Sequence, residues 1–395
     1  MNLSPFLLLC GAGLLAIFSS TISKSPVLPL FATHLGADPA GVGLVAAVSA
    51  FSGVAISLPA GLLSDRLGRR RMLLFSALVF ASAPFLYLAV TQIWQLMLVR
   101  LYHGLATAIF IPVAMALVAD LHEGARGEKI GWFSTATLLG RFVAPISGGA
   151  ILAALATDPG AGFNAVYLVC GLAGVLTLLL AWRLPRAGQR HAAAQSWPDT
   201  WAAFRLVMAN RVIVITSLAE AAVLFAYGTF EVFLPLYAIG LGLGPGEVGV
   251  FLSAQVITLA LSKPLLGRFS DRHGRPPQVF AGLLLGAACL GLYPWLQSFW
   301  GLLAMSVMFG LSLSVVTSAS AAFIADQCHG KGRGSAMGLL GSIMDLGHTS
   351  GPLLGGIAAV WLGLSTAFWL AALVMALMAL VFAGVAGLRA REKVC

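Results

Sequence analysis

The chain has 395 residues, of which 59% are hydrophobic and only 9% are charged. Soluble domains carry about a quarter charged residues, so this composition excludes a water-soluble protein. The formal net charge of +9 does not indicate nucleic-acid binding, because the basic residues stand in short clusters between apolar runs.

Apolar segments long enough to cross a membrane recur along the whole chain. Backbone polar groups find no partners in lipid, so each segment must be a helix of about 20 residues, and alternating strand patterns are absent. The sequence predicts twelve transmembrane helices, at residues 6–33, 40–64, 71–90, 93–119, 130–155, 163–183, 210–239, 245–269, 277–297, 299–325, 334–361 and 363–388.

The first apolar segment resembles a signal peptide. No Lys or Arg precedes Lys24, and Leu9 stands before Cys10 where a lipoprotein signal needs a small residue. Both features argue against cleavage, so we expect this helix to be retained.

The basic residues predict the orientation of the helices. When successive helices alternate in direction, 19 of the 23 Lys and Arg residues fall on one side of the membrane, and the other four fall within the helices. The opposite loops hold only His34, Asp38, Asp158 and Glu247 as titratable residues. The positive-inside rule then predicts cytoplasmic N- and C-termini in a cell's inner membrane.

The predicted helices form two halves. The longest polar stretch predicts a cytoplasmic linker at 184–209, between an N-terminal six-helix bundle at 1–183 and a C-terminal six-helix bundle at 210–395. The expected fold class is therefore an all-α membrane protein of two bundles.

The two halves repeat one sequence unit. The segment GLLSDRLGRRR at 61–71 aligns with GRFSDRHGRPP at 267–277, an offset of 206 residues. Gly104 aligns with Gly310 at the same offset. After one inserted residue, the pattern G-x8-G-x3-[GA]-P-x2-G-G occurs in both halves. A duplicated unit predicts two similar bundles around a central site, the architecture of alternating access.

The duplicated loop resembles the signature of the major facilitator superfamily, and the resemblance spans essentially the whole chain. It implies a transporter in which acidic and basic groups at the cytoplasmic helix ends act as conformational latches. The expected latch residues are Gly61, Asp65, Arg66, Gly68, Arg69, Asp120, Asp271, Arg272, Arg275 and Asp326. In the second copy, Pro276 replaces the last basic residue of the signature.

Two further motifs resemble the family's twelve-helix drug:proton antiporters. Arg100 with Gly104 looks like their fourth-helix motif. The glycine-proline pattern looks like their fifth-helix antiporter motif. Within this second motif, Ala144 replaces the glycine before Pro145, and Arg141 is unusual. Small residues at this spacing let helices approach closely. The expected packing residues are Gly140, Pro145, Gly149, Gly347, Pro352 and Gly356.

Seven charged residues fall within the predicted membrane helices, namely Lys24, Arg100, Arg141, Lys263, Glu220, Glu231 and Asp345. A charge at the bilayer centre costs about 3 kcal/mol or more, so such residues usually mark function. Lys263 lies near the cytoplasmic end of its helix, where its side chain can reach the interface.

Two groups of these residues are the candidates for proton coupling. Glu220 and Glu231 lie about 20° apart around one helix and about 16 Å apart along it, with Tyr227 on the same face. Asp345 and His348 are three residues apart and can couple, or they can instead stabilise a helix kink.

The sequence therefore predicts a proton-coupled exporter of small amphipathic compounds or drugs. The expected proton-coupling residues are Glu231, Glu220, Asp345 and His348, and the expected substrate-binding residues are Lys24, Arg100, Arg141 and Tyr227. The expected partners are a small-molecule substrate, protons and the lipid bilayer. We expect a monomer without cofactor, metal or nucleic acid.

Other functions remain open. The in-membrane charges, four basic and three acidic, favour an anionic metabolite or a metal chelator as the substrate. An intramembrane enzyme would need a reactive motif, and the sequence contains no H-E-x-x-H and no P-loop. A receptor or channel would leave the duplicated motifs unexplained.

Overall fold

The computed structural model describes residues 4–122, 124–185, 210–327 and 333–392. Some side chains within these ranges are not described, among them those of Asp65, Arg66 and Asp326. Most of the predicted linker at 184–209 and the residues Cys328 and Cys395 also lie outside the described part.

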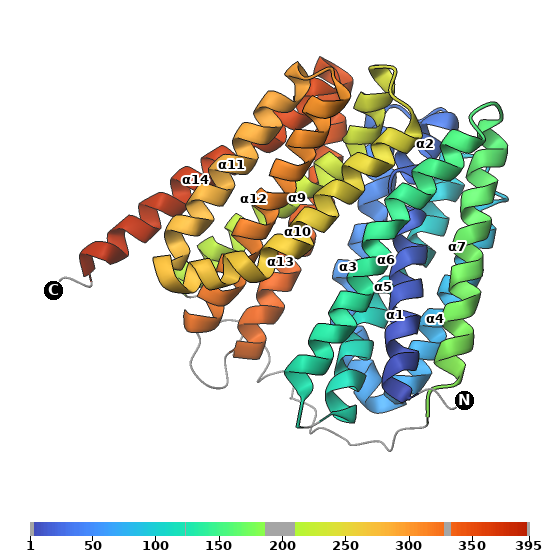
Figure 1. Ribbon diagram of the computed structural model, residues 1–395, viewed down its shortest axis with the longest axis horizontal. Helices are drawn as coiled ribbons and strands as arrows, with labels where there is room; N and C mark the ends of the chain where they lie inside the picture. The colour runs from blue at the N-terminus through green and yellow to red at the C-terminus, as the bar shows by residue number, and fades with distance from the viewer. Residues whose placement is uncertain (1–3, 123, 186–209, 328–332, 393–395) are drawn as a thin grey trace. The chain divides into compact units, whose positions relative to one another are not determined.

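The described chain is helical throughout (Figure 1). Its helices are α1 Pro5–Ile22, α2 Val27–His34, α3 Pro39–Leu67, α4 Arg69–Tyr87, α5 Ile93–Leu121, α6 Arg126–Ala154, α7 Pro159–Trp182, α9 Arg211–Gly240, α10 Pro245–His273, α11 Arg275–Leu292, the 3-10 turn η1 Tyr293–Trp295, α12 Phe299–Gln327, α13 Arg333–Leu362 and α14 Ser365–Glu392.

Ten helical segments within the described residues are long and apolar enough to cross a membrane. The turn-linked pair α1 and α2 counts as one of them, and α3 contributes a shorter apolar stretch, Pro39–Gly53. The all-helical membrane class is thus supported by length and composition, while the count of twelve stays a prediction.

Contacts divide the chain into two units, which we describe separately. The first comprises residues 1–194 with 238–253, and the second comprises 195–237 with 254–395. The first unit therefore includes the beginning of α10, and the second includes most of α9.

The first predicted segment, at 6–33, corresponds to one candidate membrane span, but this span is not one continuous helix. The chain leaves the helix after Ile22 and resumes it at Val27, and Lys24 lies in the turn between α1 and α2. Pro26 accounts for the break, because proline has no N–H to donate and disfavours helical backbone in the residue before it.

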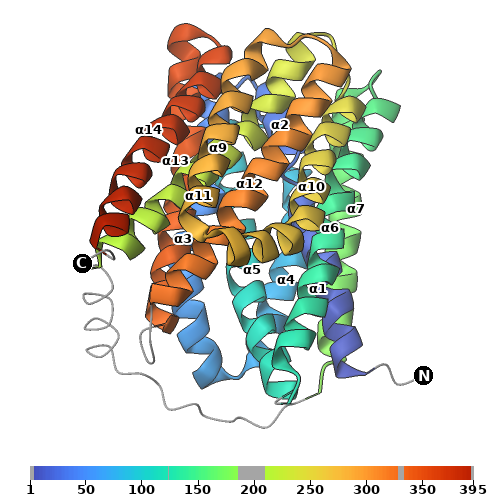
Figure 2. The same ribbon diagram turned by 60° about the vertical axis from the view of Figure 1, so that its left-hand side comes forward.

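Helix packing in the first unit centres on α1, α4 and α5. Helix α1 lies against α6 and α7, α4 lies against α5 and α7, and α3 lies against α5 (Figures 1 and 2). Phe80, Phe110 and Phe133 are fully buried in the apolar core that these contacts enclose.

The basic loops of the first unit gather at one end of its bundle. Arg70, at the start of α4, donates from Nε to the Leu184 carbonyl and from Nη2 to the Trp182 carbonyl, both at 2.7 Å. Phe6 in the first turn of α1 packs edge-on against His122 after α5, with ring centroids 5.2 Å apart. The beginning of α1 and the end of α7 therefore both lie at the basic end.

The sequence repeat reappears as a repeat of backbone conformation. Gly68 and Gly274, which are 206 residues apart, both have φ of +92° and both separate two helices. Gly36 and Gly242, at the same offset, have φ of +87° and +85°. Only glycine adopts these angles without steric cost, so both halves use the same turns for the same reason.

Close helix approaches repeat in the same way. A Cβ added to Gly140 of α6 would collide with the Leu14 carbonyl of α1, and one added to Gly347 of α13 would collide with the Ala221 carbonyl of α9. Gly140 and Gly347 are related by the offset of 207 that holds after the inserted residue, and their partners Leu14 and Ala221 differ by one residue from the offset of 206 that holds before it. Gly140 and Gly347 thus sit where two backbones touch.

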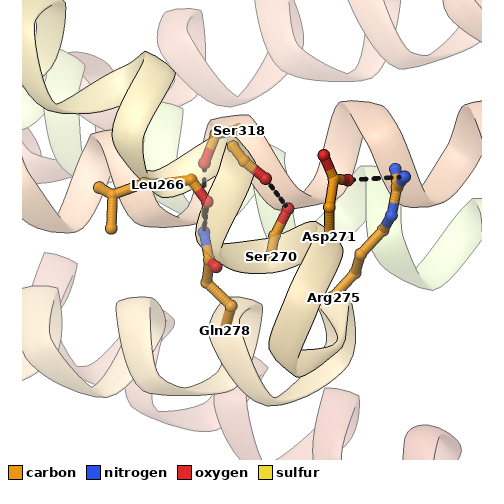
Figure 3. A network of polar contacts seen from close by, with 7 residues as sticks. Leu266, Ser270, Asp271, Arg275, Gln278 and Ser318 are labelled. Atoms are coloured by element: carbon orange, nitrogen blue, oxygen red, sulfur yellow. Dashed lines mark hydrogen bonds and ion pairs between the residues drawn. The ribbon is translucent and has the colours of Figure 1, made fainter.

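In the second unit, α11 packs between α12 and α14, and a buried amide links three of its helices (Figure 3). Gln278 of α11 donates from Nε2 to the Leu266 carbonyl of α10 at 3.1 Å. The same nitrogen lies 3.2 Å from the Val315 carbonyl and from Ser318 Oγ, both on α12. Beside it, Arg275 forms an ion pair with Asp271.

We expect Gly140→Ala to lower thermal stability of the purified protein by about 1 to 3 kcal/mol, because the new methyl group would force α1 and α6 apart. Gly131→Ala in the same helix is the matched control. Its Cβ would meet nothing within 4 Å, so helix propensity predicts a neutral or slightly stabilising effect. Equal melting temperatures for the two variants would contradict the packing role.

Candidate functional site

The clearest candidate site in the second unit joins α9 to α13. His348 Nε2 lies 3.6 Å from Glu231 Oε2, and the Tyr227 ring stacks on the imidazole with centroids 5.5 Å apart. Glu231 is buried, and Tyr227 lies one turn before it on α9. The histidine forms a true ion pair here only when it is protonated, so a single proton changes the charge of this group.

Glycine and proline bring these two helices together. A Cβ on Gly228 would lie 2.7 Å from the His348 carbonyl and 3.0 Å from Pro352 Cδ. On the facing helix, a Cβ on Gly351 would collide with the Phe225 carbonyl. The small residues therefore determine how near His348 comes to Glu231.

Glu220 forms a second buried polar contact, about three turns before Glu231 on α9. Its carboxylate Oε2 accepts a hydrogen bond of 2.5 Å from Ser320 Oγ of α12, and only 3% of the residue is exposed. Lys263 of α10 is near enough for its charge to act on this carboxylate. Glu220 is thus hydrogen-bonded within the second unit.

Asp345 lies on α13, one turn before His348, and is half-buried. The sequence pairs Asp345 with His348 as neighbours on one helix, whereas the structure also brings His348 against Glu231 from α9. The candidate proton-coupling residues Glu231 and His348 are therefore joined by a contact that the sequence did not predict.

In the first unit, Arg100 of α5 is buried with only 2% of the residue exposed. Its Nη1 donates to the Tyr87 hydroxyl at 3.2 Å, and that hydroxyl lies 3.3 Å from His103 Nδ1. Tyr87 in turn stacks on Tyr167 of α7, with ring centroids 4.3 Å apart. These residues form a compact buried cluster.

The other predicted substrate-binding cations are less buried. Lys24 is half-buried in the turn between α1 and α2. Arg141 is exposed on α6, and Lys263 is exposed on α10. Among the four basic residues that the sequence places within membrane segments, Arg100 is therefore the one that is buried.

The structure describes the contacts of some of the predicted latch residues, and their role as latches stays a prediction. Arg69 Nε lies 2.8 Å from Asp120 Oδ2, which connects the start of α4 to the end of α5. In the second copy, Arg275 instead pairs with Asp271 at 3.2 Å, and Arg272 is exposed. Gly61 and the side chains of Asp65, Arg66 and Asp326 lie outside the described residues.

The predicted packing motif of α6 contacts the beginning of α10 within the first unit. A Cβ on Gly149 would collide with the Pro245 carbonyl, and a Cβ on Gly249 would collide with the Pro145 carbonyl. Ser253 Oγ also donates to the Phe142 carbonyl at 2.8 Å. In the second motif, Pro352 and Gly356 are buried on α13.

Three residues of these contacts are not predicted by the sequence analysis, namely Tyr87, Tyr167 and Ser320. Each contacts a residue of a different helix, and no short motif marks it. The described residues contain no group of three or more His, Cys, Asp or Glu side chains that could hold a metal ion. Cys10, Cys170 and Cys289 are free thiols.

Comparison with known proteins identifies the family of this arrangement. The Major Facilitator Superfamily profile matches residues 9–245 and again 216–394, nearly the whole chain. The chain belongs to the Major Facilitator Superfamily. It is a multi-pass membrane transporter, and the resemblance inferred from its loop motifs is confirmed.

Several superfamily relatives are similar over most of their length. The chain is 23% identical to an uncharacterized MFS-type transporter of Methanocaldococcus jannaschii, over 93% of this chain and 92% of that protein. It is 27% identical to the multidrug resistance protein MdtG of Serratia proteamaculans, over 89% and 86%. A multidrug efflux pump PmrA homolog of Lactococcus lactis is 31% identical, but over only 38% of each chain.

Solved structures confirm the fold. A mutant of the nucleoside transporter NupG superimposes with a TM-score of 0.82 at 15% identity, covering 96% of this chain and 99% of that chain. A bacterial homolog of the human lysosomal transporter Spinster gives a TM-score of 0.78 at 17% identity, covering 97% and 94%. At these identities the likeness concerns the fold alone.

We expect Ser320→Ala to destabilise the protein by about 1 to 3 kcal/mol, because the buried Glu220 carboxylate would lose its hydrogen-bond donor. The loss should be larger at alkaline than at acidic pH, since a protonated carboxyl group tolerates the apolar surroundings better. Ser306→Ala is the control, because that buried hydroxyl donates to the Leu302 carbonyl of its own helix and its side-chain neighbour is the Tyr293 phenol rather than a carboxylate. The measurement is thermal unfolding at both pH values, and a pH-independent loss would argue against an ionised Glu220.

Proposed function

We propose that this transporter is a proton-coupled exporter of small amphipathic compounds, working by alternating access. The observation that carries the proposal is the buried contact between Glu231 and His348 on two helices of one bundle. The full-length similarity to multidrug resistance proteins supports the substrate class, although their identity to this chain is low.

The contact can couple proton binding to conformation. With Glu231 ionised and His348 protonated, the pair attracts and favours the arrangement that keeps α9 and α13 together. A proton on Glu231 removes its charge and its attraction to the histidine. The remaining contacts between the helices then determine which conformation of the transporter is favoured. Glu220, hydrogen-bonded to Ser320, is a second carrier on the same helix face, and Asp345 is a third candidate.

The proposed topology has twelve spanning helices with both termini in the cytoplasm. Two observations in the first unit support it: α1 begins and α7 ends at the same end of the bundle, and that end carries Arg69, Arg70 and Lys129. The positive-inside rule places such an end in the cytoplasm. We propose a monomer in the inner membrane.

The ion pair between Arg69 and Asp120 is proposed as a cytoplasmic latch. Its side chains are 19% and 41% exposed, so solvent screens it and its contribution to overall stability is small. Such a pair suits a contact that must form and break during each transport cycle.

A second candidate function is export or import of an anionic metabolite or a metal chelator. The observation that favours it is the burial of Arg100, because a guanidinium group stays charged and presents a planar fork of donors suited to carboxylates. Lys24 and Arg141 would contribute further positive charge, and Tyr227 would contact the substrate.

We expect Glu231→Gln to abolish pH-gradient-driven transport, because glutamine is close in size but cannot carry a proton. His348→Gln should weaken the same coupling, since it removes the partner of Glu231. The assay is uptake of ethidium, an amphipathic cation, into proteoliposomes with and without an imposed pH gradient.

Glu128→Gln is the matched control for the Glu231 substitution. Its carboxylate is 60% exposed and pairs with the adjacent Lys129 in the described structure, so transport should not change. Gradient-driven uptake by Glu231→Gln equal to that of the wild type would refute the carrier role. Wild-type protein that transports neither ethidium nor any organic acid in response to the gradient would contradict proton coupling itself.

We expect Asp120→Asn to slow interconversion between the access states, because Arg69 would lose its acidic partner across the α4 and α5 ends. The measurement is the labelling rate of single cysteines introduced on either side of the membrane. The charge-swapped double variant Arg69→Asp with Asp120→Arg should restore the rate. If the single and the swapped variants both label as the wild type does, the ion pair is not a latch.

A further inference from the structure

The first unit contains a buried positive charge, Arg100, for which the described residues provide no ion pair. Described ion pairs of this unit join Arg69 to Asp120 and Lys129 to Glu128, and neither includes Arg100. The neutral phenol of Tyr87 is the partner of its guanidinium group. A charge removed from water normally needs a counter-charge or a full set of hydrogen bonds.

Several hydrogen-bond donors in this cluster have no acceptor. Arg100 Nε and the Tyr167 hydroxyl are fully buried and make no hydrogen bond within the described structure. His103 Nε2 is also buried and unpartnered. When Tyr87 accepts from Arg100 and donates its own proton to His103 Nδ1, the remaining hydrogen of the imidazole is on Nε2, so this atom is a third donor.

The nearby thiol does not serve as the counter-charge. Cys170 lies one turn after Tyr167 on α7, near enough for the charge of Arg100 to act on it. Its Sγ donates a hydrogen bond to the Ser19 carbonyl at 3.0 Å, which requires the protonated thiol. Within the described part of the first unit, the buried donors therefore accompany a positive charge that has no anionic partner.

Packing holds these donors in place. The Tyr87 and Tyr167 rings are parallel within 1°, and Phe80 packs edge-on against His103 at 5.8 Å. The charge of Arg100 also reaches the Tyr167 hydroxyl, so the two groups lie in the same neighbourhood. The cluster draws on α4, α5 and α7, and all of it belongs to the first unit.

We propose that the Arg100 cluster is a binding site for a monovalent anion, with Arg100 as the charged ligand and the Tyr167 hydroxyl as a neutral donor. The chemistry fits the carboxylate of a transported compound and equally a free halide ion. A substrate carboxylate as the bound anion rests on the proposed transport function, whereas a free halide ion as the bound anion does not. The site lies on different helices from Glu231 and His348 and needs no change in their protonation.

The test is equilibrium binding of radiolabelled benzoate, and separately of radiolabelled chloride, to the purified full-length protein at constant ionic strength. We expect saturable binding to the wild type. Arg100→Gln should remove it, and Tyr167→Phe should weaken it about tenfold, since the phenol donates a hydrogen bond to a charged acceptor. Tyr167→Phe keeps the stacked ring, so it tests the site even if Arg100→Gln fails to fold.

Glu128→Gln is the control, because its carboxylate is 60% exposed and pairs with the adjacent Lys129, and it should bind both anions as the wild type does. Benzoate binding with this pattern assigns the site to a substrate carboxylate, and chloride binding alone assigns it to a free ion. No saturable binding of either anion, or undiminished binding to both Arg100→Gln and Tyr167→Phe, would overturn the proposal. Because Glu231→Gln tests proton coupling and these two variants test anion binding, either hypothesis can fail without the other.

Discussion

Direct contact between helix backbones is the constraint on which the other features of this transporter depend. Where Gly347 and Gly351 of α13 meet the carbonyls of α9, no side chain fits between the helices. Water and hydrophobic burial do not drive such association within lipid, so close packing of small residues must do so. The same contact brings His348 within 3.6 Å of Glu231, and the packing motif thereby builds the polar site.

The two bundles share this packing but differ in the chemistry it supports. In the first unit, Gly140 meets the carbonyl of Leu14, which is apolar, whereas in the second unit the equivalent contact lies beside Glu220. The first bundle instead buries Arg100 with tyrosine and histidine. A duplicated scaffold thus carries acidic groups in one half and a basic group in the other.

Much of the scaffold could be predicted from the sequence, because its determinants are local or periodic. Helix length follows from apolar runs, and the offset of the repeat correctly paired Gly68 with Gly274. The loop motifs identified the superfamily. The break before α2 was missed because the apolar run continues through it, although Pro26 is the visible signal.

The candidate site could be predicted only in part, because its contacts join distant segments. Helical periodicity places Glu220, Tyr227 and Glu231 on one face, but periodicity within α9 says nothing about which helix faces them. The sequence pairs His348 with Asp345, its neighbour on the same helix, whereas the structure also places Glu231 of α9 beside it. Tyr87 and Tyr167 carry no motif, and their stacking depends on how α4 and α7 pack.

We propose that Glu231 and His348 bind and release protons as a coupled pair, and pH-difference infrared spectroscopy of the purified protein in lipid nanodiscs can test this coupling. We expect a protonated-carboxyl C=O band that appears on acidification and loses a component in Glu231→Gln. A reciprocal change in the imidazole bands should vanish in His348→Gln. A difference spectrum that is the same in the wild type and in both variants would show that the two residues do not titrate as a pair.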